Sequence, residues 1–242
     1  MADNGQLPAQ KSSQADVDAF LRRVAAIPGA RPAGGKRGRL MFAMDATASR
    51  EPSWDRACQL QGEMFEQTAA LGGLDVSLVY YRGFRECQAS PWVANSAELL
   101  RRMTAVRCHA GQTQLGRVLS HCQKQTRQEK VNALVFVGDS FEEDIDDVAH
   151  RAGELGLLGV PVFVFHEGAD PIAKRAFQTV ARLTGGAYCP FDASSAQQLR
   201  DLLSAVAVFA AGGRVALETF SRGRGESVRL LTSQVGRPGG GA

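Results

Sequence analysis

The sequence predicts an α/β fold, in which a doubly wound, mostly parallel sheet carries helices on both faces. Short apolar runs of strand length alternate along the chain with longer segments whose apolar residues recur at helical spacing. The clearest runs are apolar almost without interruption, as is typical of strands covered on both faces. Strands that alternate with helices form right-handed crossovers, and these build a parallel sheet between two helical layers.

The predicted strands are short runs bounded by turn residues. In chain order they cover residues 40–44, 74–81, 84–89, 131–137, 160–165 and 187–189. The third is assigned to an edge of the sheet, because Pro91 follows it closely and a proline cannot donate a hydrogen bond to a neighbouring strand. The remaining strands are expected to form the parallel part of the sheet.

The predicted helices carry apolar side chains three and four residues apart. In chain order they cover residues 13–27, 54–71, 96–106, 115–122, 145–155, 172–183 and 199–206. Asn95 or Ser96 is expected to cap the third of these helices. Ser194 with Gln197 has the spacing of a capping box, which would open the last one.

Composition divides the chain into three parts. Residues 1–38 are a polar segment, a short helix and a Gly/Pro-rich linker; residues 39–211 form the folded domain; residues 212–242 are a C-terminal extension with a flexible tail from Gly225. Residues 1–39 carry seven Lys or Arg against three Asp, and residues 212–242 carry five Arg against two Glu. The part between them carries sixteen Lys or Arg against twenty Asp or Glu, a net charge of −4. The basic ends are expected to be solvated, with an acidic partner, nucleic acid or the domain itself as alternative contacts.

Composition also excludes several classes of protein. The chain has 242 residues, of which 44% are hydrophobic and 22% charged, as is ordinary for a globular domain. The first forty residues contain no apolar segment of the kind that a signal peptide needs, and no stretch approaches the eighteen apolar residues of a membrane-spanning helix. The five cysteines are scattered without a Cys-x-x-Cys pair, so we expect free thiols. The expected protein is cytoplasmic, with neither a membrane nor nucleic acid as its partner.

Polar side chains follow two of the predicted strands. Asp45, with Thr47 and Ser49 at alternate positions after it, follows the first strand, and Asp139 follows the fourth. A third loop, which runs into a helix, contributes Thr113. In a doubly wound sheet such loops meet where the strand order reverses. Two carboxylates and three hydroxyls are hard oxygen ligands that suit Mg²⁺ or Mn²⁺, so the sequence predicts a metal site. In the alternative, Asp45 turns the chain and one of the hydroxyls caps the next helix.

These residues resemble the metal-ion-dependent adhesion site (MIDAS) of von Willebrand factor A (vWA) domains, whose usual pattern is Asp-x-Ser-x-Ser, then Thr, then Asp. Thr47 stands where the pattern has serine and keeps the hydroxyl. Gly138-Asp139-Ser140 stands where Thr-Asp-Gly is commoner. The resemblance covers about residues 38–211. Two further segments, 159–165 and 183–188, are similar to a late strand of that family and to the end of its domain.

The resemblance implies a Rossmann-like vWA fold and a protein-binding module that is not an enzyme. In that family the metal coordinates an Asp or Glu of a partner protein. Cytoplasmic bacterial members are often partners of AAA+ ATPases or parts of larger assemblies, so an adaptor with a degenerate metal site is one alternative. The other alternative is a Mg²⁺-dependent phosphatase that uses Asp45 as its nucleophile, although such enzymes usually have a second Asp where this chain has Thr47.

Other polar residues are predicted close to this site. The acidic residues from Glu142 to Asp147 are expected to favour the N-terminus of the following helix through its dipole, with a second cation or a basic partner as alternatives. His166 ends a strand on the same side of the sheet and is expected to be a neighbour of the site, not a ligand. His109 and His121 are expected to be surface or core residues.

Overall fold

The computed structural model describes residues 37–47, 51–191, 196–222 and 224–235. These residues form a six-stranded sheet in the order β3-β2-β1-β4-β5-β6. The strands are β1 (Gly38–Asp45), β2 (Leu74–Arg82), β3 (Glu86–Ala89), β4 (Ala133–Gly138), β5 (Val162–Glu167) and β6 (Ala187–Phe191). All neighbouring strands are parallel except β2 and β3, which pair antiparallel. The predicted sheet is therefore confirmed, including its edge strand.

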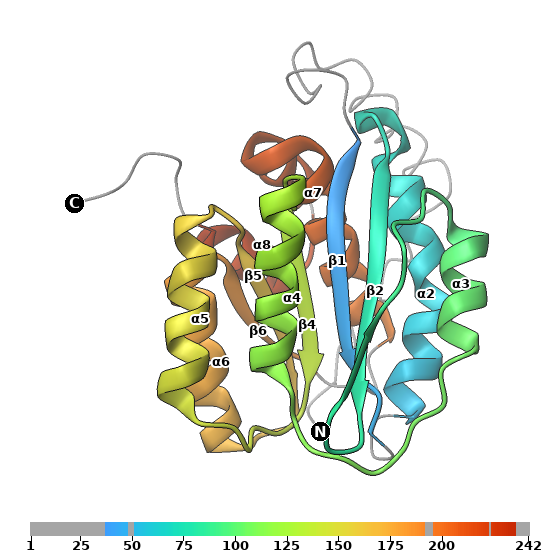
Figure 1. Ribbon diagram of the computed structural model, residues 1–242. Helices are drawn as coiled ribbons and strands as arrows, with labels where there is room; N and C mark the ends of the chain where they lie inside the picture. The colour runs from blue at the N-terminus through green and yellow to red at the C-terminus, as the bar shows by residue number, and fades with distance from the viewer. Residues whose placement is uncertain (1–36, 48–50, 192–195, 223, 236–242) are drawn as a thin grey trace, which may run out of the picture.

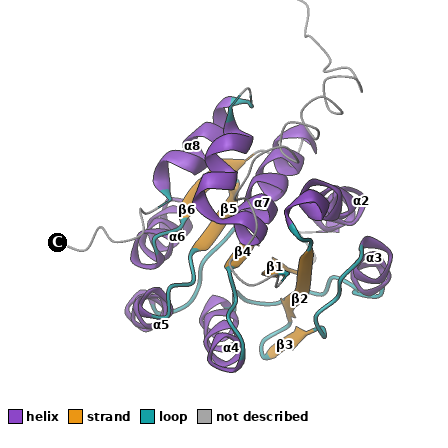
Figure 2. Ribbon diagram, turned by 90° about the horizontal axis from the view of Figure 1, so that it is seen from above, coloured by secondary structure: helices purple, strands orange, loops and turns teal. Residues whose placement is uncertain are grey.

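Helices cover both faces of the sheet, as predicted (Figure 1). They are α2 (Glu51–Thr68), the short 3-10 helix η2 (Ala69–Leu71), α3 (Ser96–Thr104), α4 (Leu115–Gln128), α5 (Ile145–Leu157), α6 (Pro171–Thr184), α7 (Ala196–Ser221) and α8 (Glu226–Gln234). Figure 2 shows α4, α5 and α6 on one face and α2 and α7 on the other, with α3 beside β2 and α8 beside β6. The helix predicted over 13–27 lies outside the described residues.

Strand β1 explains why the apolar runs predict the fold so well. All eight of its residues are buried. Leu40, Phe42 and Met44 belong to the core on the α2 and α7 face, whereas Met41 and Ala43 belong to the core on the α4, α5 and α6 face. Successive side chains of a strand point to opposite faces, so a strand between two helical layers must be apolar at every position.

The chain reverses its direction across the sheet at β1. From β1 it moves to β2 and β3 on one side, and it then returns to β4, β5 and β6 on the other. The order therefore switches between β1 and β4, which pair directly from Leu40↔Ala133 to Met44↔Val137. Asp45 and Asp139 stand at the carboxyl ends of these two strands. This is the position at which open α/β sheets bind ligands.

Helix α7 is longer than the sequence indicates. It continues past the predicted domain boundary at residue 211 and bends at Gly213, whose φ of 70° and ψ of −165° are not helical. Its stretch Leu199–Ser221 has a mean hydropathy of 1.4 and is apolar and long enough to cross a membrane by composition alone. However, 61% of that stretch is buried against the rest of the fold, including β1 and α2. Packing in the core accounts for its apolar character.

The expected tail from Gly225 is wrong for residues 226–234, which form α8. Val228 and Leu231 are buried against the domain. The side-chain amide of Gln234 pairs with the backbone of Tyr188 in β6: its Oε1 accepts from the Tyr188 N–H at 2.8 Å, and its Nε2 donates to the Tyr188 carbonyl at 2.9 Å. Helix α8 thus covers this edge of the sheet. Its nine residues contain too few apolar positions for the periodicity to stand out.

Candidate metal centre

Asp45 and Thr47 form a tight turn at the end of β1. The Asp45 side chain is 2% exposed, and its Oδ1 accepts a hydrogen bond from the Thr47 N–H at 2.8 Å. An aspartate that accepts from the backbone N–H two residues ahead stabilises such a turn. The turn that the sequence offered as an alternative is therefore present, and it is compatible with a metal ligand because a carboxylate accepts several contacts. Ser49 lies outside the described residues.

The loop that carries Thr113 is hydrogen-bonded to the segments that follow β1 and β2. The N–H of His109 donates to the Ala46 carbonyl at 2.9 Å, and the N–H of Gln112 donates to the Gly83 carbonyl at 3.0 Å. Gly111 packs directly on the turn between β2 and β3, since a Cβ at this position would lie 2.2 Å from the Gly83 nitrogen. A loop pinned on both sides presents Thr113 in a fixed position.

Thr113 also contacts the loop that follows β4. Its hydroxyl donates to the Ser140 carbonyl at 3.3 Å, and its N–H donates to Glu142 Oε2 at 3.1 Å. Asp139 is the first residue after β4, and its Oδ1 accepts a hydrogen bond from the Ser140 hydroxyl at 3.2 Å. A hydroxyl that gives its hydrogen to a carbonyl keeps its lone pairs for another contact, which is the state needed to ligate a cation.

The structure thus brings three of the predicted loops to one place. Asp45 and Asp139 end adjacent strands, Thr47 folds back on Asp45, and Thr113 touches the Asp139 loop. All four side chains offer hard oxygen atoms, which fits Mg²⁺ or Mn²⁺ and does not fit a softer site. No group of three or more His, Cys, Asp or Glu suited to a metal occurs within the described ranges. A cation bound here would therefore need hydroxyl, backbone carbonyl or water oxygens beside the two carboxylates.

Acidic residues after β4 have roles that the sequence assigned only in outline. Asp144 caps its own helix, α5, by accepting from the N–H groups of Asp146 and Asp147, and these two acids lie in the first turn, where the helix dipole is expected to favour them. Glu143 instead caps the neighbouring helix, α4: its carboxylate accepts from the N–H of Leu115 at 2.5 Å and of Gly116 at 3.0 Å. A cap supplied from another loop has no local spacing, so the sequence gives no signal for it.

Burial raises the pKa of Glu143 above the ordinary carboxyl value. The N–H groups of Gly116 and Leu115 lower this pKa in part, and the nearby charge of Asp147 raises it further. The stability associated with this raised pKa is fully present below the pKa of the unfolded chain and is lost as the pH rises through the folded value. Glu143→Gln, which does not ionise, is expected to lose less stability over that pH window than the wild type. Urea unfolding at a series of pH values measures this, and Asp146→Asn serves as the exposed control. Parallel profiles for wild type and Glu143→Gln would contradict the expectation.

His166, at the end of β5, is a neighbour of the site as predicted. It is 1% exposed, its Nδ1 lies 2.8 Å from the Tyr188 hydroxyl, and its ring packs edge-on against Phe177. Burial lowers the pKa of His166, whereas the backbone and charge of Asp139 raise it. The ring therefore supports the Asp139 loop from behind. His109 is exposed, and His121 is half-buried on α4.

Comparison with known proteins finds similarity in structure alone. No protein-family model matches the sequence, and no curated protein does. The SpRpn10 VWA domain matches with a TM-score of 0.53 and 16% sequence identity, over 69% of this chain and 94% of that one. Proximal thread matrix protein 1 from the mussel byssus, in a structure with a zinc-occupied MIDAS motif, matches with a TM-score of 0.54 and 14% identity, over 71% of this chain and 46% of that one.

A pilus adhesin, SpaC from Lactobacillus rhamnosus GG, matches with a TM-score of 0.54 and 10% identity, over 77% of this chain and 30% of that one. This chain therefore spans nearly all of the SpRpn10 domain but less than half of the mussel and Lactobacillus proteins. At such low sequence identities these similarities show a shared fold only. The ligands of each protein depend on the residues of its own site.

Proposed function

From the vWA fold of this chain we propose that it is a cytoplasmic, non-enzymatic protein-binding module. It binds Mg²⁺ or Mn²⁺ through Asp45, Thr47, Ser49, Thr113 and Asp139, and the metal coordinates an Asp or Glu of a partner protein. The observation that carries the proposal is the junction of the three loops at the β1–β4 switch point, where Thr113 contacts the loop of Asp139.

The charge balance of these ligands explains why the partner offers a carboxylate. Asp45 and Asp139 together neutralise a divalent cation, whereas the hydroxyls of Thr47, Ser49 and Thr113 add only weak neutral ligands. The cation would therefore remain electron-poor and prefer a further anionic oxygen. The zinc-occupied MIDAS of the mussel protein supports divalent-metal binding on this fold.

The surface beside the site also suits a protein partner. Phe84, at the tip of the turn between β2 and β3, is 75% exposed, although Gly83 beside it is held by Gln112 and Gln114. A large aromatic side chain on a fixed turn is the kind of residue that dominates protein interfaces. Exposed Arg85 follows it in the chain, and exposed Arg107 lies in the segment whose carbonyl accepts from Arg82 Nη1 at 2.7 Å. Both arginines favour an acidic partner surface.

Thermal unfolding in EDTA, Mg²⁺ and Mn²⁺ tests the metal site. A cation at one hundred times its dissociation constant adds about 2.7 kcal/mol to the free energy of unfolding. For a chain of this size the melting temperature should rise by roughly 5–10 °C in the wild type and not in Asp45→Ala. Asp146→Ala is the matched control, because Asp146 is an exposed carboxylate near the same edge of the sheet.

The control separates a specific site from diffuse attraction of cations to acidic residues. Equal rises in the wild type and Asp45→Ala, with a smaller rise in Asp146→Ala, would refute the proposed ligands. Absence of any rise would favour the alternative of an adaptor with a degenerate metal site, for which an AAA+ ATPase is the partner to test.

A further inference from the structure

The outer edge of β3 carries backbone groups that none of the six described strands occupies. Ser90 donates to the Leu78 carbonyl at 2.8 Å, and in the same register Gln88 pairs with Tyr80. Hydrogen-bonded pairs alternate along an antiparallel ladder, so the N–H and C=O groups of Cys87 and Ala89 point away from β2. Across the described part of the chain no hydrogen-bond partner occurs for these four groups.

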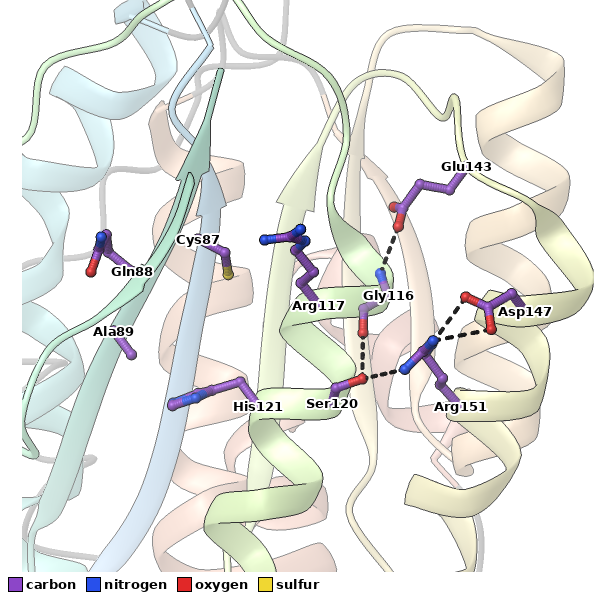
Figure 3. Close-up of a pocket in the computed structure, with 10 residues that line it drawn as sticks. All are labelled: Cys87, Gln88, Ala89, Gly116, Arg117, Ser120, His121, Glu143, Asp147 and Arg151. Atoms are coloured by element: carbon purple, nitrogen blue, oxygen red, sulfur yellow. Dashed lines mark hydrogen bonds and ion pairs between the residues drawn. The ribbon is translucent and has the colours of Figure 1, made fainter. Parts of the chain in front are cut away.

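This edge borders a groove beside helix α4, shown in Figure 3. The groove has a volume of about 640 Å³. It is lined by Cys87, Gln88 and Ala89 of β3, by Gly116, Arg117, Ser120 and His121 of α4, and by Glu143, Asp147 and Arg151 beyond them. Gly116 and Ser120 stand one turn apart on α4, and their small size keeps the groove open between the larger side chains.

The helix side of the groove is basic where it faces β3. Arg117 and His121 of α4 line the groove, and Arg117 Nη1 donates to the Arg85 carbonyl at 2.9 Å; Lys124 follows at helical spacing further along α4, outside the lining. Neither Arg85 nor Arg117 forms an ion pair with a carboxylate among the described residues. Arg151 differs, because Asp147 holds it through two contacts of 3.1 Å. The free positive charge therefore lies next to the open edge.

We propose that an extended, acidic segment of a partner protein binds in this groove as an added strand beside β3. Its backbone would pair with the N–H and C=O groups of Cys87 and Ala89, and its carboxylates would face Arg117. Strand addition between an edge strand and a helix gives affinity through the backbone and selectivity through the side chains. This site is separate from the metal centre and does not depend on it.

Charge also decides between two occupants of the edge. If a second copy of this chain paired its β3 with this one, it would bring its own Arg85 and Arg117 to the interface, whereas the one carboxylate of its β3, Glu86, is already held by Arg82. Like charges brought together across an interface are unfavourable. An acidic segment places opposite charges at the same positions, so the partner and not a second copy is the proposed occupant.

The probe is a fluorescein-labelled peptide of alternating Glu and Val, titrated with the full chain in EDTA and followed by fluorescence anisotropy. In an added strand, the N–H groups of every second residue face β3 and those of the residues between them face solvent. Two further peptides are N-methylated, one on each of these two sets of residues. One peptide therefore cannot donate hydrogen bonds to β3, whereas the other keeps these donors and loses only those that face solvent. We expect their affinities to differ by about tenfold or more, the effect of losing strand hydrogen bonds.

Protein variants locate the site. Ala89→Pro removes an outward N–H without removing a bond to β2, and should weaken binding about tenfold. Arg117→Gln should weaken binding about threefold to fivefold. Arg127→Gln, at the other end of the same helix, should leave binding unchanged. Circular dichroism of each variant checks that the fold is retained, and hydrogen exchange of the Cys87 and Ala89 amides in the wild type should slow when the peptide binds.

The inference is overturned if the peptide fails to bind, if both N-methylated peptides bind as well as the parent, or if the two amides exchange at an unchanged rate. A free chain that sediments as a dimer, and as a monomer after Ala89→Pro, would assign the edge to a second copy and also overturn it. Because binding is measured in EDTA, these results stand apart from the test of the metal centre.

Discussion

Replacing Phe177 by alanine is expected to lower the free energy of unfolding by about 3–5 kcal/mol, the usual effect of emptying a buried aromatic position. Phe177 on α6 is fully buried, and its ring centroid lies 5.5 Å from that of Phe136, 6.3 Å from that of Phe141 and 5.2 Å from that of His166. It therefore joins the sheet to the loop after β4. The melting temperature should fall by roughly 6–20 °C.

Differential scanning calorimetry measures this change, and Ile172→Ala is its matched control. Ile172 lies on the same helix but is 64% exposed, so its loss should alter stability by less than about 0.5 kcal/mol. Similar melting temperatures for Phe177→Ala and Ile172→Ala would show that Phe177 does not contribute to core packing as described.

A second large effect is expected from Gly111→Ala, on the metal centre as well as on stability. The new Cβ would lie 2.2 Å from the nitrogen and 2.4 Å from the oxygen of Gly83, both backbone atoms that cannot turn aside as a side chain can. The loop and the β2–β3 turn must separate, which costs about 1–3 kcal/mol. The hydrogen bond from Gln112 to Gly83 would be lost, and Thr113 would no longer be fixed.

Under the proposed function, Gly111→Ala should therefore reduce or abolish the rise in melting temperature that Mg²⁺ or Mn²⁺ produces. Gly153→Ala is the control: Gly153 lies within α5, and a Cβ there would meet no atom within 4 Å. That substitution should stabilise the chain by up to about 1 kcal/mol, since alanine favours a helix over glycine. A full metal response in Gly111→Ala would mean that the loop tolerates displacement.

The parts of the fold that the sequence predicts are those with a local pattern. Strand β1, apolar without a break from Leu40 to Met44, and the edge strand before Pro91 are examples, because each follows from residues adjacent in the chain. Asn95 is another, since its side chain caps α3 from the position expected. Asp45 and Asp139 could be placed at one edge because the order of a doubly wound sheet brings them there.

The features that escaped prediction depend on partners far along the chain. Glu143 caps a helix that begins 28 residues before it, and Gln234 pairs with a strand residue 46 positions away. For neither residue do the adjacent residues form a pattern that predicts this contact. The open groups of Cys87 and Ala89 depend on which residues of β3 pair with β2, and a shift of one residue would reverse them.

The two edges of the sheet are unequal, and this sets a limit on how the molecule can assemble. A sheet with two open edges can join copy to copy without end, as in fibres. Here Gln234 fills the hydrogen-bonding positions of Tyr188 on β6, which leaves β3 as the edge available for addition. Within the described residues the β6 side offers no second open edge to a strand from another copy, so growth stops after one step. The expected complexes are closed and of fixed stoichiometry.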